Sequence, residues 1–315
     1  MMEIKKRYNE TVDILRAVLI LLVILVHIVN FGDIYPGVKY SVLAFFMPAF
    51  LVITGYLVNV RKTLKQFCSY ILQIALPYII MVSGFMVLSL YLPVRGGVQE
   101  LTLDTVCRVL FVTSIGPYWY FRIMIICGVL YYAAFRLLPE RYGVVARYSL
   151  FAALLIAVSY LTPALTLKAA AYYFIGVGVR VFGNDISSII RPSLFTVLPF
   201  LLLICNDSFH DWGALSILAC SLCFFSFTAK AGEYMRGSLR TAMLYLGRNT
   251  FPVYVFHPIF TMLSKYCLPL FSFDPSGLLH TAFTILLATA GSLGIGIVMD
   301  RLHLTYVFGK AKMMR

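Results

Sequence analysis

The chain has 315 residues, of which 61% are hydrophobic and 12% charged, and its mean hydropathy is +0.89. A soluble domain carries about 25% charged residues, so this composition excludes an ordinary water-soluble fold and indicates a polytopic membrane protein whose main partner is the lipid bilayer. Membrane proteins gather Lys and Arg in cytoplasmic loops; the formal net charge of +13 therefore reflects topology, and we expect no nucleic-acid partner.

The apolar segments predict an all-α bundle of about ten transmembrane helices, because a bilayer core of about 30 Å requires roughly 20 apolar residues per helix. The first segment is too long for a signal-peptide core, and no small-residue cleavage site follows it, so we expect it to remain as a span. The one long connection, residues 92–117, could contain a short amphipathic segment on the membrane surface. The expected spans are residues 13–30, 38–60, 70–92, 117–138, 145–162, 168–182, 190–206, 212–229, 245–267 and 278–299.

The basic residues predict that both termini are cytoplasmic. With this orientation, external loops hold only five basic residues: Lys39, Arg95, Arg108, Lys168 and Lys265. The cytoplasmic segments hold 19: Lys5, Lys6, Arg7, Arg61, Lys62, Lys65, Arg136, Arg141, Arg147, Arg180, Arg191, Lys230, Arg236, Arg240, Arg248, Arg301, Lys310, Lys312 and Arg315. The sequence shows no internal repeat, so we expect a single membrane domain over residues 1–315.

The sequence contains no motif that indicates a metal site or a nucleotide-binding site. Seven cysteines are scattered through apolar segments, and the CxxC of Cys220 and Cys223 has no His or Cys neighbours, so we interpret it as packing and expect no metal. No nucleotide-binding glycine loop and no zinc-binding helix is present.

The first apolar segment, VDILRAVLILLVILVH, is unusual because it carries both Arg16 and His27. Eleven residues are about three helical turns, so the two side chains share one face, roughly 16 Å apart along the axis. Asp13 lies three residues before Arg16 and can pair with it. Ionisable groups inside a span usually face a bundle interior or a water-filled path, and we therefore expect Arg16 and His27 to line one cavity.

Each of these residues also has a structural interpretation. Arg16 could be a snorkelling interfacial arginine, and His27 could be a helix-terminal histidine bonded to a carbonyl. Because Arg16 and His27 lie on the same face of the helix, a shared role in one site is favoured over two independent structural roles. A neutral imidazole is also well suited to removing a proton from a hydroxyl near neutral pH.

These residues and several later motifs resemble the acyltransferase-3 family of integral membrane acyltransferases. Asp13-x-x-Arg16 followed by His27 is similar to the family's first-helix signature. The other matching stretches are FFMPAFLVITGYLV at 45–58, in which Thr54 replaces a serine, LPY at 76–78, PYWYF at 117–121, YFIG at 173–176 and VYVFHPIF at 253–260. The motifs occur in order along nearly the whole chain.

The resemblance implies an O-acyltransferase that uses acetyl-CoA or another acyl-CoA and modifies a hydroxyl of a saccharide or glycolipid at the bacterial inner membrane. It suggests Arg16 as part of the acyl-donor region and His27 as the residue that activates the acceptor hydroxyl. The family often has Arg-x-x-Arg after its second helix, whereas this chain has Lys62 and Lys65 after Arg61. A lysine contacts phosphate as a point charge, so this loop is a weaker candidate for holding the donor.

Further candidates have site and structural interpretations. His257 falls near the middle of the ninth span and could serve the site or pack against a carbonyl. Arg122 could line the site or snorkel; Trp119 and Tyr120 could stack on a sugar or anchor the helix at the interface. The Thr54–Tyr56 stretch is expected to allow close helix approach.

The remaining histidines, His210, His280 and His303, lie in or beside expected loops, where we predict that water solvates them.

Two other functions are compatible with polar residues inside a helix bundle. The chain could be a transporter that exports a saccharide or small solute, or it could be a non-catalytic subunit of a glycan-synthesis complex.

Overall fold

The computed structural model describes residues 9–92, 94, 96–183, 186 and 189–315, and these residues form helices without any strand. Four residues of the charge count, Lys5, Lys6, Arg7 and Arg95, lie outside this part. The α-helices are α1 (Glu10–His27), α2 (Val29–Ile34), α3 (Pro36–Leu57), α4 (Leu64–Ser89), α5 (Leu103–Arg108), α6 (Trp119–Leu137), α7 (Gly143–Leu161), α8 (Leu167–Gly183), α9 (Val197–Ile204), α10 (Leu215–Tyr234), α11 (Gly237–Arg248), α12 (Thr250–Leu263) and α13 (Leu278–Arg301).

Every expected span overlaps one of these helices. In the described part of the chain, six helical segments are long and apolar enough to cross a membrane: Pro36–Leu57, Leu64–Ser89, Gly116–Leu137, Glu140–Leu161, Leu215–Tyr234 and Leu278–Arg301. Helix α1 has 18 residues but carries Glu10, Asp13 and Arg16. Helices α8, α9 and α12 are shorter, with 17, 8 and 14 residues. The chain is therefore a multi-pass membrane protein.

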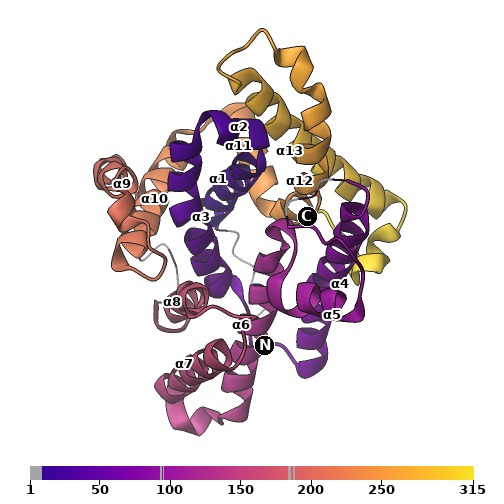
Figure 1. Cartoon of the computed structure of the whole chain (residues 1–315). Coiled ribbons are helices and arrows are strands. Elements are labelled where there is room, and N and C mark those ends of the chain that lie inside the picture. Colours follow the sequence, from indigo (N-terminus) through magenta and orange to yellow (C-terminus); the bar gives the residue numbers. More distant parts are fainter. Residues whose placement is uncertain (1–8, 93, 95, 184–185, 187–188) are drawn as a thin grey trace. The chain divides into compact units, whose positions relative to one another are not determined.

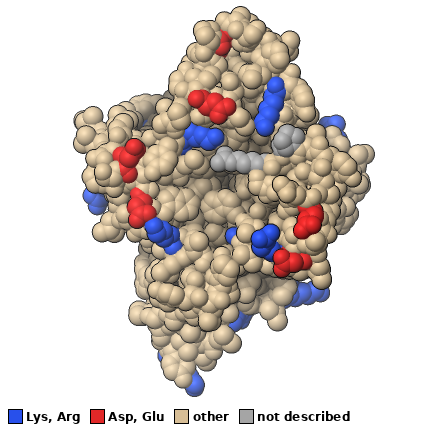
Figure 2. Space-filling model, in the orientation of Figure 1, with Lys and Arg blue, Asp and Glu red and all other residues tan. Residues whose placement is uncertain are grey.

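The surface of the helices is strongly apolar, as a lipid environment requires. Leu161, Phe195 and Leu215 are 81%, 86% and 82% exposed. On the face drawn in Figure 2, charged side chains are sparse and most of the surface belongs to other residues. Such exposure would be unfavourable in water and is favourable against lipid tails.

The long connection between α4 and α6 contains helical structure. Thr102 caps α5, because its hydroxyl accepts a hydrogen bond from the Thr105 backbone amide at 3.2 Å. A single π-helical segment, Val109–Thr113, continues it.

The chain divides into two compact units. Unit 1 comprises residues 1–50, 185–297 and 314–315, and unit 2 comprises residues 51–184 and 298–313.

Helix α1 is central to unit 1, where it packs against α10, α11 and α12 (Figure 1). It begins after Asn9, whose side chain accepts a hydrogen bond from the Val12 amide at 3.3 Å. Gly247 allows α11 to approach α1 closely, because a Cβ atom there would lie only 1.9 Å from the Asp13 carbonyl oxygen. The polar end of α1 is therefore held against the end of α11.

In unit 2, two glycines bring α3 and α8 into backbone contact. A Cβ atom at Gly55 would lie 2.1 Å from the Tyr173 carbonyl oxygen, and one at Gly176 would lie 2.0 Å from the Val52 carbonyl oxygen. Small residues permit such approach between membrane helices. The expectation of close packing around Gly55 is thus confirmed.

The prediction of solvated histidines is wrong at two of three positions. His210 is buried and donates a hydrogen bond through Nε2 to the Ile204 carbonyl at 2.9 Å. His280 is also buried, and its Nε2 donates to the Ser264 carbonyl at 3.0 Å. Each ring satisfies a carbonyl at the end of a helix, which explains its burial. His303 is exposed, as expected.

Candidate active site

The polar residues of α1 form two groups in unit 1, and the first surrounds Asp13. This carboxylate is 9% exposed and accepts a hydrogen bond from the Arg248 Nε at 3.1 Å. The Arg16 guanidinium lies 3.7 Å from the other carboxylate oxygen, which confirms the pair expected from their spacing. Arg16 also donates to the Thr250 hydroxyl at 2.6 Å. One acidic and two basic residues leave this group, the Asp13 cluster, with one positive charge in excess.

The Asp13 cluster joins α1 to the junction of α11 and α12. Asn249, between Arg248 and Thr250, is buried and ends α11; its side chain donates to the Tyr245 carbonyl at 2.8 Å and accepts from the Arg315 backbone amide at 2.7 Å. The junction is thus fixed from both sides. An arginine that bonds a neighbouring helix is not a snorkelling arginine, so the cluster excludes that interpretation of Arg16.

Sequence reasoning missed Arg248 and Thr250 as members of this site. The charge count treats Arg248 only as a cytoplasmic residue, although it stands two residues before the helix that carries His257. A basic residue at the start of a span that contains a histidine was the available signal. Its partner could not be read from sequence, because Asp13 lies 235 residues away.

The second group is a pair of histidines, His27 and His257. Their ring centroids are 5.2 Å apart and the ring planes are inclined by 70°. His27 is the last residue of α1 and is partly buried, whereas His257 is fully buried in α12. The structure therefore brings together two candidates that are 230 residues apart in the sequence.

Hydrogen bonds to carbonyls fix the tautomer of both rings. His27 Nδ1 lies 2.6 Å from the Val23 carbonyl oxygen, and His257 Nδ1 lies 3.1 and 3.0 Å from those of Val253 and Tyr254. A carbonyl oxygen can only accept, so each Nδ1 carries a proton, and in the neutral form of each ring the lone pair is on Nε2. Within the described residues, Nε2 of His257 is buried and has no hydrogen-bond partner. Both rings thus present a basic nitrogen.

The two groups lie at opposite ends of α1, where each also contacts α12. Arg16 bonds Thr250 at the start of α12, and eleven residues later His27 meets His257. Since α1 rises 1.5 Å per residue, the Asp13 cluster and the histidine pair are roughly 16 Å apart along the helix. The arrangement provides a positively charged end and an end with two adjacent histidines.

The aromatic candidates lie in unit 2, at the start of α6. Trp119 is partly buried and contacts the ring of Tyr120 edge-on. The Tyr120 hydroxyl is hydrogen-bonded to that of Thr54, and Arg122 donates through Nε to the Ala164 carbonyl at 3.2 Å. These contacts tie α6 to its neighbours within the unit. They assign no chemistry to the three residues.

The loop before α4, also in unit 2, carries Lys62 and Lys65. The Lys62 ammonium lies 4.3 Å from the centre of the Tyr70 ring, and its carbonyl accepts hydrogen bonds from Tyr132 and Arg136. Lys65 is exposed in the first turn of α4. Cation–π contact orders Lys62, while the Lys65 ammonium remains accessible to an anion.

Two further observations bear on the chemistry. In the described ranges, no three His, Cys, Asp or Glu side chains gather as metal ligands. Comparison with protein-family models matches residues 9–299 to the acyltransferase-3 model, which describes an acyltransferase domain. Comparisons with curated proteins and with solved structures gave no match. The matched range contains both the Asp13 cluster and the histidine pair.

Proposed function

Because the chain belongs to the acyltransferase-3 family, we propose that it transfers an acetyl group from acetyl-CoA to a hydroxyl of a cell-surface saccharide or its lipid-linked precursor. The observation that carries the chemistry is the tautomer of His27. With Nδ1–H donated to the Val23 carbonyl, the neutral ring carries its lone pair on Nε2, and this nitrogen is suited to act as a general base.

The proposed setting is the bacterial inner membrane, crossed by about ten spans with both termini in the cytoplasm. The distribution of basic residues supports this orientation. It puts the Asp13 cluster at the cytoplasmic end of α1, where acyl-CoA is available, and the histidine pair at the external end, where surface glycans are completed.

In the proposed reaction, His27 Nε2 removes the proton from the acceptor hydroxyl while the oxygen attacks the thioester carbon. An ester C–O bond forms, the C–S bond breaks, and the imidazolium returns its proton to the departing thiolate of coenzyme A. The lone pair of His257 supports this role, because a neutral base beside His27 stabilises the imidazolium that forms. His257 is thus a second site residue.

At the other end, the excess positive charge of the Asp13 cluster suits an anionic donor. The Arg16 guanidinium is held by Asp13 and Thr250 in one orientation, which fits a planar, directed contact with the donor. Arg248 belongs to the same cluster and adds the second cation. Lys62 and Lys65 are candidates for weaker contacts with the nucleotide phosphates.

Transfer of label from acetyl-CoA to glycan in isolated membranes tests the proposal. Replacing His27 with Ala or with Gln should each abolish transfer, since a general base contributes roughly 10²–10⁴-fold and glutamine cannot accept a proton at neutral pH. The matched control is His303→Gln, an exposed histidine outside the site. Variants are compared at equal amounts of membrane protein, because a misfolded variant would mimic catalytic loss.

Three outcomes would contradict the proposal in different ways. Near-normal activity of His27→Gln would disprove the general-base role, since it would show that only a hydrogen bond is needed. Movement of a solute without thioester consumption would identify a transporter. If His27→Ala leaves glycan acylation intact while loss of the whole chain removes it, the protein is a non-catalytic subunit.

A further inference from the structure

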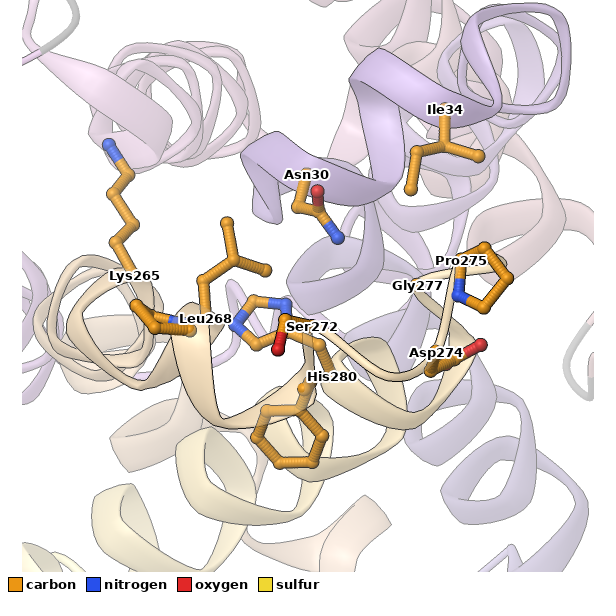
Figure 3. A pocket seen from close by; sticks show the side chains of 11 residues that line it. Asn30, Ile34, Lys265, Leu268, Ser272, Asp274, Pro275, Gly277 and His280 are labelled. Atoms are coloured by element: carbon orange, nitrogen blue, oxygen red, sulfur yellow. The ribbon is translucent and has the colours of Figure 1, made fainter.

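A cavity of about 490 Å³ lies in unit 1 beyond the ends of α1 and α12 (Figure 3). One wall comes from α2, which follows His27. The other comes from the 3₁₀-helical segment Ser264–Phe271, which follows α12, and from the start of α13. Its volume is within the range of about 300–1,000 Å³ that small-molecule sites occupy. None of the site candidates described above lines it.

His280 gives this cavity an unsatisfied hydrogen-bond acceptor. The ring is 2% exposed, and its Nε2–H is committed to the Ser264 carbonyl, so Nδ1 carries a lone pair. Among the described residues, Nδ1 is buried and has no partner. A buried acceptor without a partner costs free energy that a ligand donor can recover. The cavity therefore favours a ligand that donates an O–H or N–H group.

Other polar groups of the lining are also available. The side chains of Asn30 and Ser272 form no hydrogen bond with any described residue, and Figure 3 shows Asn30, Ser272 and His280 around one space. An amide and a hydroxyl each donate and accept, as a ligand with several hydroxyls requires. The Lys265 ammonium at the rim completes the polar lining.

The Asp274 carboxylate lines the same cavity but is committed to the backbone. It accepts hydrogen bonds from the Ser276 amide at 3.0 Å, the Ser276 hydroxyl at 2.5 Å and the Leu279 amide at 2.8 Å. The hydrogen bond from the Ser276 hydroxyl lowers the pKa of this carboxyl, which therefore stays ionised at neutral pH. Its negative charge offsets Lys265, so the cavity suits a neutral ligand.

The rest of the lining is apolar. Phe271, Leu268, Pro269, Pro275 and Ile34 contribute carbon surface, and the Phe271 ring lies 5.6 Å from that of His280. A sugar ring combines hydroxyl groups at its edge with C–H groups on its faces, which matches a lining that contains both polar groups and carbon surface.

From these groups we infer that the cavity binds one sugar residue of the acceptor through its hydroxyls, with one hydroxyl donating to His280 Nδ1. The inference rests on the proposed function and adds the acceptor subsite. Asn30 lies three residues after His27, so their Cα atoms are at most about 11 Å apart. A sugar held here is beside the proposed base. Phosphocholine has no N–H group and, as the dianion, no O–H group that could donate to His280, so it should not occupy the site.

Binding can be measured without any acyl donor, by saturation-transfer NMR on the purified full-length chain in detergent. The probes are methyl glucoside, methyl galactoside and methyl rhamnoside, with phosphocholine as the non-sugar probe. At least one glycoside should bind. Asn30→Ala should weaken it by about tenfold, which corresponds to the loss of about 1.4 kcal/mol, a typical hydrogen bond. Asn206→Ala, in an exposed loop outside the cavity, is the matched control.

Two substitutions of His280 separate recognition from folding. The Gln side chain can keep the donation to Ser264 but offers no acceptor at the Nδ1 position, whereas Asn can supply that acceptor. His280→Gln should therefore weaken the glycoside about tenfold, and His280→Asn should bind more tightly than His280→Gln. Absence of glycoside binding, equal binding by Asn30→Ala and wild type, or displacement of glycoside by phosphocholine would overturn the inference.

The acceptor subsite and the proposed function can fail separately. If glycosides bind and the variants bind them more weakly, but the membranes transfer no acetyl group, the results support the sugar subsite and refute the proposed function. If acetyl transfer occurs while Asn30→Ala leaves the acceptor KM unchanged, the function stands and the subsite falls. Support for both requires a raised acceptor KM with little change in kcat.

Discussion

Asp13 should be essential for the stability of α1, because one carboxylate is shared by two arginines. Asp13→Asn keeps the shape of the side chain but removes its charge. Arg16 and Arg248 would then face each other across a neutral amide in a largely buried position. The substitution therefore breaks both ion pairs of Asp13 and leaves the two arginines without a compensating negative charge.

The expected cost follows from burial. Breaking a buried ion pair by removing one partner costs about 3–5 kcal/mol. Arg248 is 34% exposed and water can solvate it in part, so we expect a value near the lower end, about 3 kcal/mol. The matched control is Glu10→Gln in the same helix, which removes the exposed pair with Arg240 and should cost less than about 1 kcal/mol.

Denaturant unfolding of the purified protein in detergent measures both values. The informative comparison is the double variant Asp13→Asn with Arg248→Gln. Removing the uncompensated arginine should restore more than half of the lost free energy of unfolding, because contacting residues are not additive. A double variant that is less stable than Asp13→Asn alone would refute the shared-carboxylate explanation.

Three other results are expected. Gly247→Ala should cost about 1–3 kcal/mol in unfolding free energy, since its Cβ would overlap the Asp13 carbonyl, whereas Gly294→Ala in open space should be neutral or stabilising. In topology mapping, a cysteine placed beside Arg141 should resist labelling from outside intact cells; strong labelling there would reverse the proposed orientation. Arg16→Lys should raise the KM for the acyl donor although the charge is kept, and an unchanged value would argue against a directed guanidinium contact.

Sequence patterns predicted what is local in this fold. Apolar length located the helices, and helical spacing predicted the pair of Asp13 and Arg16, because residues three apart on a helix are neighbours. The partners on α11 and α12 depend on tertiary packing, which local spacing does not contain. Thr250 therefore became visible only as the neighbour of Arg16 in the folded chain.

Sequence position also failed to predict the burial of His210 and His280, because that burial depends on contacts between helices. His280 was expected in solvent because it stands in or beside an expected loop. In the fold it begins the buried face of α13 and caps the Ser264 carbonyl after α12. Proximity to a loop predicted exposure, but an unpaired carbonyl at the end of another helix determined where the imidazole lies.

Packing around α1 favours an enzyme over a transporter that moves this helix during its cycle. Alternating access requires elements that rock or gate around the binding site. Here the Asp13 cluster fixes α1 to the junction of α11 and α12, and Gly247 holds the backbones in contact. A catalytic site gains from such rigidity, since reacting groups must stay aligned.

A disulfide clamp tests whether α1 stays in place during turnover. A Cβ atom at Gly232 on α10 would lie 3.8 Å from the Cβ atom of Ile14 on α1, which is the mean separation in disulfides. Oxidising the double variant Ile14→Cys with Gly232→Cys should therefore link the helices and leave acetyl transfer near the level of the reduced protein. The two single variants control for lost packing and for pairing with native Cys220 or Cys223. Activity that disappears on oxidation of the double variant alone and returns on reduction would show that α1 must move against α10.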